Sequence, residues 1–228
     1  MVVYASHVSV QRHVLAHPAL RTLSPSASRY LVTSFWTLQA QRIKRGTLRD
    51  FEPAALFVWI PKTAGSSMAR WLRKSIGLIE AHNINRFVRS EAELSRAKAL
   101  TVGHQDLDSL IRLKLLRPQP LEAAFSFVFV RNPFTRAVSL WKYLTRKGDY
   151  PSSRSFRAFI DDIVRENPKP GPYNSSGLSM ASPMACWVEQ ERWHGPSVHY
   201  RMENLDDAIN DLGARLNVEN DFPRVNTS

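Results

Sequence analysis

Short apolar runs of strand length alternate with amphipathic stretches from residue 54 onward, and this alternation limits the fold more than any other feature of the sequence. The runs that we predict to be strands are residues 56–60, 100–103, 125–130 and 197–201. The first and third are almost continuous in apolar residues, as expected of strands that are covered on both faces. We therefore predict an α/β fold of three layers, a central parallel sheet flanked by helices.

Between and after these runs, apolar residues recur at helical spacing. This spacing predicts helices in residues 66–76, 135–146, 156–164 and 205–216. Ser90 and Glu93 have the spacing of a capping box, and Ser155 stands where it can cap the third of these helices. Residues 167–182 are rich in proline and glycine, so we predict a loop there, of the kind that often borders a substrate.

Positive charge is concentrated at the start of the chain. The 228 residues carry 31 Lys plus Arg and 20 Asp plus Glu, a net charge of +11, which favours anionic partners. Residues 1–49 hold seven of the basic residues and no acid. Apolar spacing predicts a helix in residues 27–45 that packs on the domain, and a leader in residues 1–23 is the alternative. We divide the chain into a basic N-terminal extension with a helix, residues 1–50, and one domain, residues 51–228.

Several classes of protein are disfavoured by what the sequence lacks. Cys186 is the one cysteine, so neither an internal disulfide nor a cysteine-pair zinc site is expected. No cluster of His, Asp and Glu has the spacing of metal ligands, so we expect no metal. The longest apolar runs are much shorter than the roughly 20 residues that cross a bilayer. We expect a soluble cytoplasmic protein, or an organelle or Golgi-lumenal one if the N-terminus is a leader or has been trimmed.

The first predicted strand leads directly into a turn of small and polar residues, and a predicted helix follows at once. Main-chain N–H groups of such a P-loop-like turn, with the helix dipole, attract an anion. Lys62 adds a full charge, and Thr63, Ser66 and Ser67 add hydroxyl groups. The lysine precedes the glycine, unlike in the Walker pattern, which disfavours an ordinary ATPase or kinase. A purely structural tight turn is the alternative.

A second buried strand ends in Arg131, and Pro133 stands where it can begin the next helix. Arg131 is then at the carboxyl end of the sheet, the edge at which open α/β sheets bind ligands, and its guanidinium can hold a phosphate. Ser139 could add a hydroxyl to the same anion. A structural salt bridge of Arg131 is the alternative.

The two segments together, Ile60-Pro-Lys-Thr-Ala-Gly-Ser-Ser67 and Val130-Arg-Asn-Pro-Phe-Thr-Arg-Ala-Val-Ser139, resemble the PAPS-dependent sulfotransferases, most of all the carbohydrate branch (Golgi-type, heparan 2-O-sulfotransferase-like). Gly103-His104, the stretch 200–205 and Val225-Asn-Thr-Ser228 are further likenesses. The resemblance implies that the first segment holds the 5′-phosphosulfate of 3′-phosphoadenosine 5′-phosphosulfate (PAPS) and the second its 3′-phosphate. The residues to which it gives a cofactor-binding role are Lys62, Thr63, Ala64, Gly65, Ser66, Ser67, Arg131, Ser139, Asn226 and Ser228. One departure is Trp59, where many relatives have His.

Sulfuryl transfer to a hydroxyl requires a cation near the leaving oxygen and a base for the acceptor proton. We predict that Lys62 supplies the cation and His104 the base, because an imidazole titrates near neutrality and Gly103 lets the chain turn toward the cleft. A histidine satisfied by local hydrogen bonds is the alternative for His104. We expect a carbohydrate or other hydroxyl-bearing acceptor, which could be anionic, and no metal.

Two other functions remain open at this stage. A P-loop-type small-molecule kinase would use Lys62 on a phosphate, but no Mg²⁺-binding carboxylate stands at a strand end. A basic nucleic-acid-binding module would explain the net charge, but no nucleic-acid-binding motif is present, so we expect no nucleic acid as partner. A sulfotransferase-like protein that binds without turnover is a third alternative.

Overall fold

The computed structural model describes residues 48, 51–81, 91–112, 115–165, 178–189 and 191–223. Its described part contains a five-stranded parallel sheet in the order β2-β3-β1-β4-β5. The strands are β1 (Ala55–Val58), β2 (Leu78–Glu80), β3 (Ala99–Thr101), β4 (Phe125–Val130) and β5 (Val198–Arg201). The predicted α/β fold with a central parallel sheet flanked by helices is confirmed.

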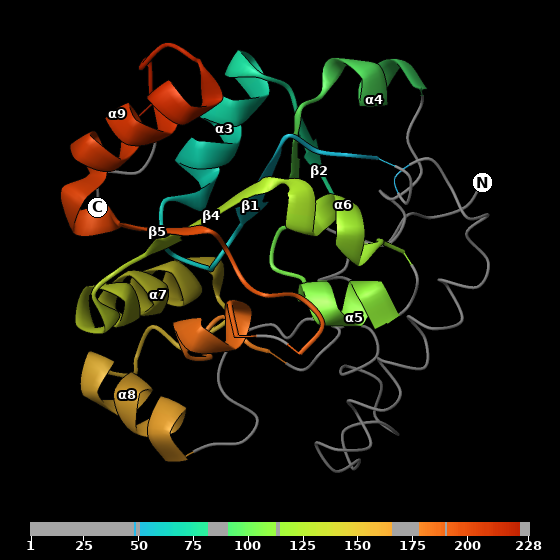
Figure 1. The fold of residues 1–228 in the computed structure, drawn as a ribbon. Helices are drawn as coiled ribbons and strands as arrows, with labels where there is room; N and C mark the ends of the chain where they lie inside the picture. Colours follow the sequence, from blue (N-terminus) through green and yellow to red (C-terminus); the bar gives the residue numbers. More distant parts are fainter. Residues whose placement is uncertain are drawn as a thin grey trace, which may run out of the picture.

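Helices cover both faces of this sheet (Figure 1). They are α3 (Gly65–Ser75), α4 (Glu91–Arg96), α5 (Leu107–Arg112), α6 (Pro118–Ala123), α7 (Pro133–Lys147), α8 (Phe156–Arg165) and α9 (Leu205–Leu216). Two short 3₁₀ helices, Met184–Trp187 and Met202–Asn204, complete the described elements.

Strands β1 to β4 supply side chains to two cores, because successive residues of a strand point to opposite faces. Phe57 and Phe127 pack under α3 and α9, together with Trp71 and Leu212. Their neighbours in the strands, among them Leu56 and Val128, pack on the other face with residues of α5 and α6. This two-sided burial explains the nearly continuous apolar runs of β1 and β4, since neither face of these strands meets water.

Helices α7 and α8 both begin at side chains that cap their first N–H groups. Pro133 is the first residue of α7, as predicted, and the Asn132 side chain accepts from the N–H groups of Phe134 and Thr135. The Ser155 hydroxyl accepts from the N–H of Ala158, 3.2 Å away, as expected for the cap of α8. A third small core, formed by Leu140, Leu144, Phe159 and neighbours, joins α7 to α8.

Some predictions fall outside the described residues. These are the helix in residues 27–45, Ser90 of the predicted capping box, the greater part of the loop 167–182, and the cofactor-binding residues Asn226 and Ser228. The extension 1–50 and the domain boundary at residue 51 stay predictions.

Candidate functional site

The predicted functional residues follow three adjacent strands. Lys62 follows β1, His104 follows β3 and Arg131 follows β4, and β1 lies between β3 and β4. All three strands are parallel, so their carboxyl ends lie at one edge of the sheet. The topology therefore brings the turn that holds Lys62 between the other two residues, although 69 positions separate Lys62 from Arg131.

The turn after β1 has an unusual backbone. Lys62 and Ala64 have left-handed φ values of 69° and 65°. Such a conformation costs about 1–2 kcal/mol for a residue with a Cβ, so the surroundings must hold it. One contact that does so is the hydroxyl of the fully buried Thr63, which donates to the carbonyl of Ile60 at 2.9 Å. The Thr63 hydroxyl hydrogen therefore closes the turn, and the predicted contact of Thr63 with an anion is left to its main-chain N–H.

The same turn ends at the N-terminus of α3. Ala64 is the N-cap, and its side chain has no group that could accept from the first-turn N–H groups. Ser66 is exposed and Ser67 is buried. The N–H groups and the dipole of an uncapped N-terminus at a sheet edge can attract an anion, and the anion-binding role of Lys62–Ser67 stays a prediction.

Gly65 is needed at the start of α3 because the Trp59 indole lies against it. A Cβ on Gly65 would lie 1.6 Å from Trp59 Nε1, which is far inside any allowed contact. The Trp59 indole also contacts the rings of Phe57 (5.9 Å) and His104 (5.3 Å between centroids). The large side chain at position 59 thus packs between the turn after β1 and the predicted base.

Lys62 is surrounded by an aromatic ring and two cations. Its Nζ lies 4.3 Å from the centroid of the Tyr143 ring, a cation–π contact with α7. Burial lowers the pKa of Lys62 below its ordinary value, and the positive charges of Arg146 and Arg131 lower it further. An anion placed beside Lys62 would reverse that effect, since it would stabilise the charged ammonium.

Arg131 touches both the turn after β1 and helix α7. Its Nη1 donates to the Lys62 carbonyl at 3.5 Å, and its Nε donates to the Thr135 hydroxyl at 3.1 Å. No salt bridge of Arg131 is found within the described residues, so the alternative raised from the sequence gains no support there. Glu203, which follows β5, accepts from the N–H of Asn132 at 2.7 Å and so fixes the backbone beside Arg131.

Ser139 lies on the face of α7 that contains these groups. Thr135, Ser139 and Tyr143 are four residues apart in turn, and such residues form one row along a helix. Thr135 binds Arg131 and Tyr143 contacts Lys62, and the half-buried Ser139 stands between Thr135 and Tyr143 in this row. Its contact with an anion stays a prediction.

His104 is held by a main-chain hydrogen bond and two indoles. Its Nδ1 is 2.9 Å from the Trp59 carbonyl oxygen, and its ring meets those of Trp59 and Trp187 edge-on, the latter at 6.2 Å. A carbonyl oxygen can only accept, so Nδ1 carries the proton and Nε2 carries the lone pair of the neutral imidazole. Gly103, with φ 61°, makes the turn that the sequence predicted. The tautomer is the one that a base acting through Nε2 requires.

Arg136 is a buried residue of this region that the sequence reasoning missed. Its guanidinium donates to the carbonyl oxygens of Pro61 (3.0 Å), Ser182 (3.1 Å) and Met180 (2.8 Å). The signal was present in the pattern, because Arg136 stands four residues before Leu140 on the buried stripe of α7. Burial lowers its pKa to about 10, so it remains charged at neutral pH.

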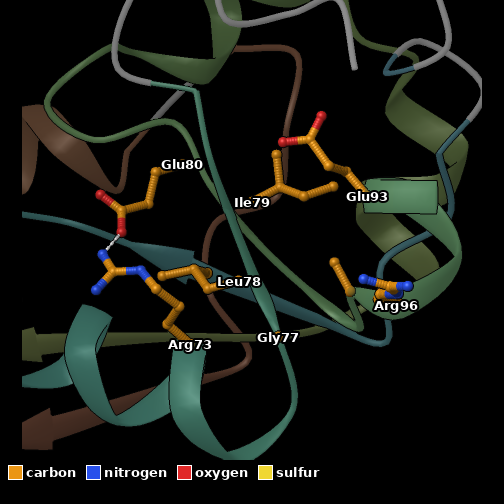
Figure 2. Close-up of a pocket in the computed structure, with 8 residues that line it drawn as sticks. Arg73, Gly77, Leu78, Ile79, Glu80, Glu93 and Arg96 are labelled. Carbon is orange, nitrogen blue, oxygen red and sulfur yellow. Dashed lines mark hydrogen bonds and ion pairs between the residues drawn. The ribbon is translucent and has the colours of Figure 1, made fainter. Parts of the chain in front are cut away.

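A separate groove lies at the outer strand β2. It has a volume of about 410 Å³ and is lined by residues of β2, the end of α3 and α4, with an ion pair between Arg73 and Glu80 (Figure 2). None of the residues predicted to bind or react lines it. The candidate site is therefore the edge formed by the turns after β1, β3 and β4.

Metal-ligand clusters and membrane-spanning helices are both absent from the described ranges. These ranges contain no group of three or more His, Cys, Asp or Glu side chains that could hold a metal ion. They also contain no helix that has both the length and the apolar character needed to span a membrane.

A strand, a turn that holds Lys62 and a helix, with Arg131 after the next strand, define a P-loop-like α/β protein whose candidate site is rich in positive charge. The model of the sulfotransferase family matches residues 48–228, and the chain belongs to that family. The predicted class of enzyme, a sulfotransferase, is confirmed at this level.

Two solved structures are similar to the chain. The sulfotransferase from Alicyclobacillus acidocaldarius is 18% identical with a TM-score of 0.43, over 77% of this chain and 85% of that one. Mouse sulfotransferase SULT7A1, complexed with PAP, is 14% identical with a TM-score of 0.43, over 75% of this chain and 62% of that one. A search of the curated proteins gives no match.

Proposed function

We propose that this sulfotransferase moves the sulfuryl group from PAPS to a hydroxyl of a carbohydrate acceptor, with His104 as the base. The observation that supports it most is the contact between the two motifs, in which Arg131 donates to the carbonyl of Lys62, while Thr135 and Tyr143 of α7 contact Arg131 and Lys62. A ligand with two separate anionic groups, such as PAPS, fits a site in which two cations lie at two different turns.

The residues divide into those that hold PAPS and those that act on the acceptor. The turn of Lys62–Ser67 holds the 5′-phosphosulfate, while Arg131 and Ser139 hold the 3′-phosphate. PAPS supplies an activated sulfuryl group, and the charge of Lys62 stabilises the negative charge that grows on the leaving phosphate oxygen. His104 takes the proton of the acceptor hydroxyl through Nε2, because Nδ1 is bonded to the Trp59 carbonyl.

The experiment that tests the cofactor is calorimetric titration with PAP, beside 5′-AMP and Mg-ATP. We expect binding that requires the 3′-phosphate. Lys62→Ala and Arg131→Ala each remove a charged contact, so each should weaken PAP binding by roughly 10- to 100-fold or more. Lys147→Ala removes a charge of the same sign from an exposed position near the end of α7 and serves as the control. A preference for Mg-ATP would instead support a kinase.

The base and the acceptor need a turnover assay with labelled PAPS. His104→Ala should keep PAP binding and lose transfer, whereas His199→Ala, at an exposed position of β5, should keep both. Near-normal transfer by His104→Ala would remove it from the role of base. Transfer to a phenol such as 4-nitrophenol, with none to a desulfated glycosaminoglycan, would contradict the carbohydrate acceptor.

The domain, the compartment and the remaining residues belong to the same proposal. Residues 51–228 form the catalytic domain, and residues 1–50 are a basic extension. Asn226 and Ser228 contribute to the PAPS site, as their resemblance implies. A single cysteine suits a reducing compartment, so the cytoplasm is the compartment we expect.

A further inference from the structure

Arg136 connects two parts of the chain that the catalytic proposal treats separately. Its Nε bonds to the carbonyl of Pro61, at the start of the anion-binding turn, and its two terminal nitrogens bond to the carbonyls of Met180 and Ser182. The side chain is 7% exposed, and the partners found for it are main-chain oxygens. The positive charge of Arg136 is thus buried, and the dipoles of three carbonyl groups stabilise it. In return, one rigid, planar guanidinium fixes the positions of these three carbonyl groups.

The bond to Pro61 determines the direction of the peptide that precedes Lys62. A trans peptide has its C=O and N–H on opposite sides, so holding the Pro61 carbonyl toward α7 also fixes the Lys62 N–H. The next carbonyl, that of Lys62 itself, accepts from Arg131. Two arginines of one segment, Arg131 and Arg136, therefore hold consecutive peptides of the turn in which Lys62 has its left-handed φ.

The other two hydrogen bonds of Arg136 fix residues 180 and 182, in the segment whose Trp187 packs against His104. Residues 178–182 are closed by their own hydrogen bonds, in which the Ser182 hydroxyl accepts from the N–H of Ser179. Five residues after Ser182, the buried Trp187 packs against the His104 ring, with 6.2 Å between centroids. Residues 178–189 thus connect the guanidinium of Arg136 to the Trp187 ring, which packs against the imidazole of His104.

We propose that Arg136 is a positioning residue, which holds the Lys62 turn and residues 178–189 in one arrangement and so sets where Lys62 lies relative to His104. It touches neither PAPS nor the acceptor in this role. The inference rests on the proposed function for its catalytic meaning, but the mechanical link can be measured without any ligand.

The test is amide hydrogen exchange of the full chain, read in peptides that cover residues 62–67 and 178–189. Arg136→Lys keeps the positive charge but loses the planar guanidinium that donates to three carbonyl oxygens, and Arg136→Met loses both the charge and these donors. Arg157→Lys, at an exposed position of α8, is the matched control. In Arg136→Lys we expect exchange to be roughly tenfold faster in both segments together, with α9 and β4 unchanged, and a larger effect in Arg136→Met. A rise in one segment alone, or in neither, would overturn the proposal.

A second readout separates positioning from general stability. In the wild type, saturating PAP should slow exchange in residues 178–189 as well as in 62–67, because both are attached to Arg136. In Arg136→Lys, PAP should slow exchange in 62–67 and have little effect on 178–189. Equal slowing of 178–189 in both proteins would overturn the proposed link. Failure of the wild type to bind PAP would count against the proposed function, while the ligand-free exchange rates would still decide the role of Arg136.

Discussion

Replacing Gly65 by alanine should disrupt the site through Trp59 and not through the backbone. The new Cβ would lie 1.6 Å from Trp59 Nε1 and 2.2 Å from Cδ1 and Cε2. Two heavy atoms in contact prefer about 3.5–4.0 Å, so the indole has to retreat by roughly 2 Å. It cannot do so freely, because its ring packs against those of Phe57 and His104.

The size of the effect follows from the cost of overpacking, which is about 1–3 kcal/mol for one extra group in a packed site. For a chain of this length 1 kcal/mol changes Tm by roughly 2–4 °C. Gly65→Ala should therefore lower Tm by roughly 2–12 °C. It should also weaken PAP binding, because α3 begins at Gly65 and its N-terminus is the proposed phosphosulfate site.

The cause is tested with a double-mutant cycle. Trp59→Ala removes the clashing ring, so Gly65→Ala should cost much less in that background, with a coupling of about 1–2 kcal/mol measured from thermal or urea unfolding. Gly148→Ala is the control: its φ is 73° and nothing lies within 4 Å of the added Cβ, so its cost is conformational and Trp59→Ala should not relieve it. Additive effects of Gly65→Ala and Trp59→Ala would refute the steric explanation.

Three further predictions concern the groups around the site and the last helix. Asn132→Ala removes the cap of α7 and should cost about 1 kcal/mol in the free energy of unfolding and weaken PAP binding, as melting and calorimetry would detect; an unchanged Tm would contradict the cap. PAP affinity should begin to fall with rising pH before the ordinary lysine pKa of 10.5 is reached, because burial and the charges of Arg146 and Arg131 lower the pKa of Lys62 and the anion binds its charged form; in Lys62→Arg this decline should disappear, and an equal decline in both proteins would assign it to another group. Asp211 accepts from Arg215 and Tyr200, which lower its pKa below 3.8, so its stabilising effect is present above that pH and is lost as pH falls through the lowered pKa. Urea unfolding should therefore show Asp211→Asn to be less stable than the wild type at pH 7, with the difference shrinking as pH falls below 3.8; a constant difference would contradict the ionic origin.

The elements that the sequence predicted correctly are those with long or strongly periodic patterns. The predicted strand at 125–130 has the bounds of β4, and the predicted helices at 66–76 and 135–146 lie within one or two residues of α3 and α7. The strand β2 was missed because it has three residues, of which only Ile79 is buried, and so shows no period. Helices α5 and α6 were missed because each has six residues, fewer than two turns, and their stability comes from packing on the sheet.

The site was predictable to the extent that its chemistry is local in sequence. Lys62 and Arg131 stand at strand ends, where a strand-turn-helix pattern reveals them, and the parallel sheet brings them together. The contacts of Arg136 connect positions 75, 46 and 44 residues apart through carbonyl oxygens, which every residue type carries, so no motif could indicate its partners. The packing of Trp59 on Gly65 depends on side-chain shape, which the pattern of apolar residues does not contain.

The distribution of charge in the site explains why the anion would also stabilise the fold. Lys62 lies near Arg146 and Arg131, and their mutual repulsion and the burial of Lys62 raise the free energy of the ligand-free protein, as the lowered pKa of Lys62 indicates. Arg136 adds a buried charge, and burial alone lowers its pKa to about 10. An anion at the turn would offset this cost, and a ligand at 100 times its Kd adds about 2.7 kcal/mol to the free energy of unfolding. Tm should then rise by roughly 5–11 °C with PAP, and a rise with inorganic sulfate alone should be smaller, because a single anion neutralises one of the two turns.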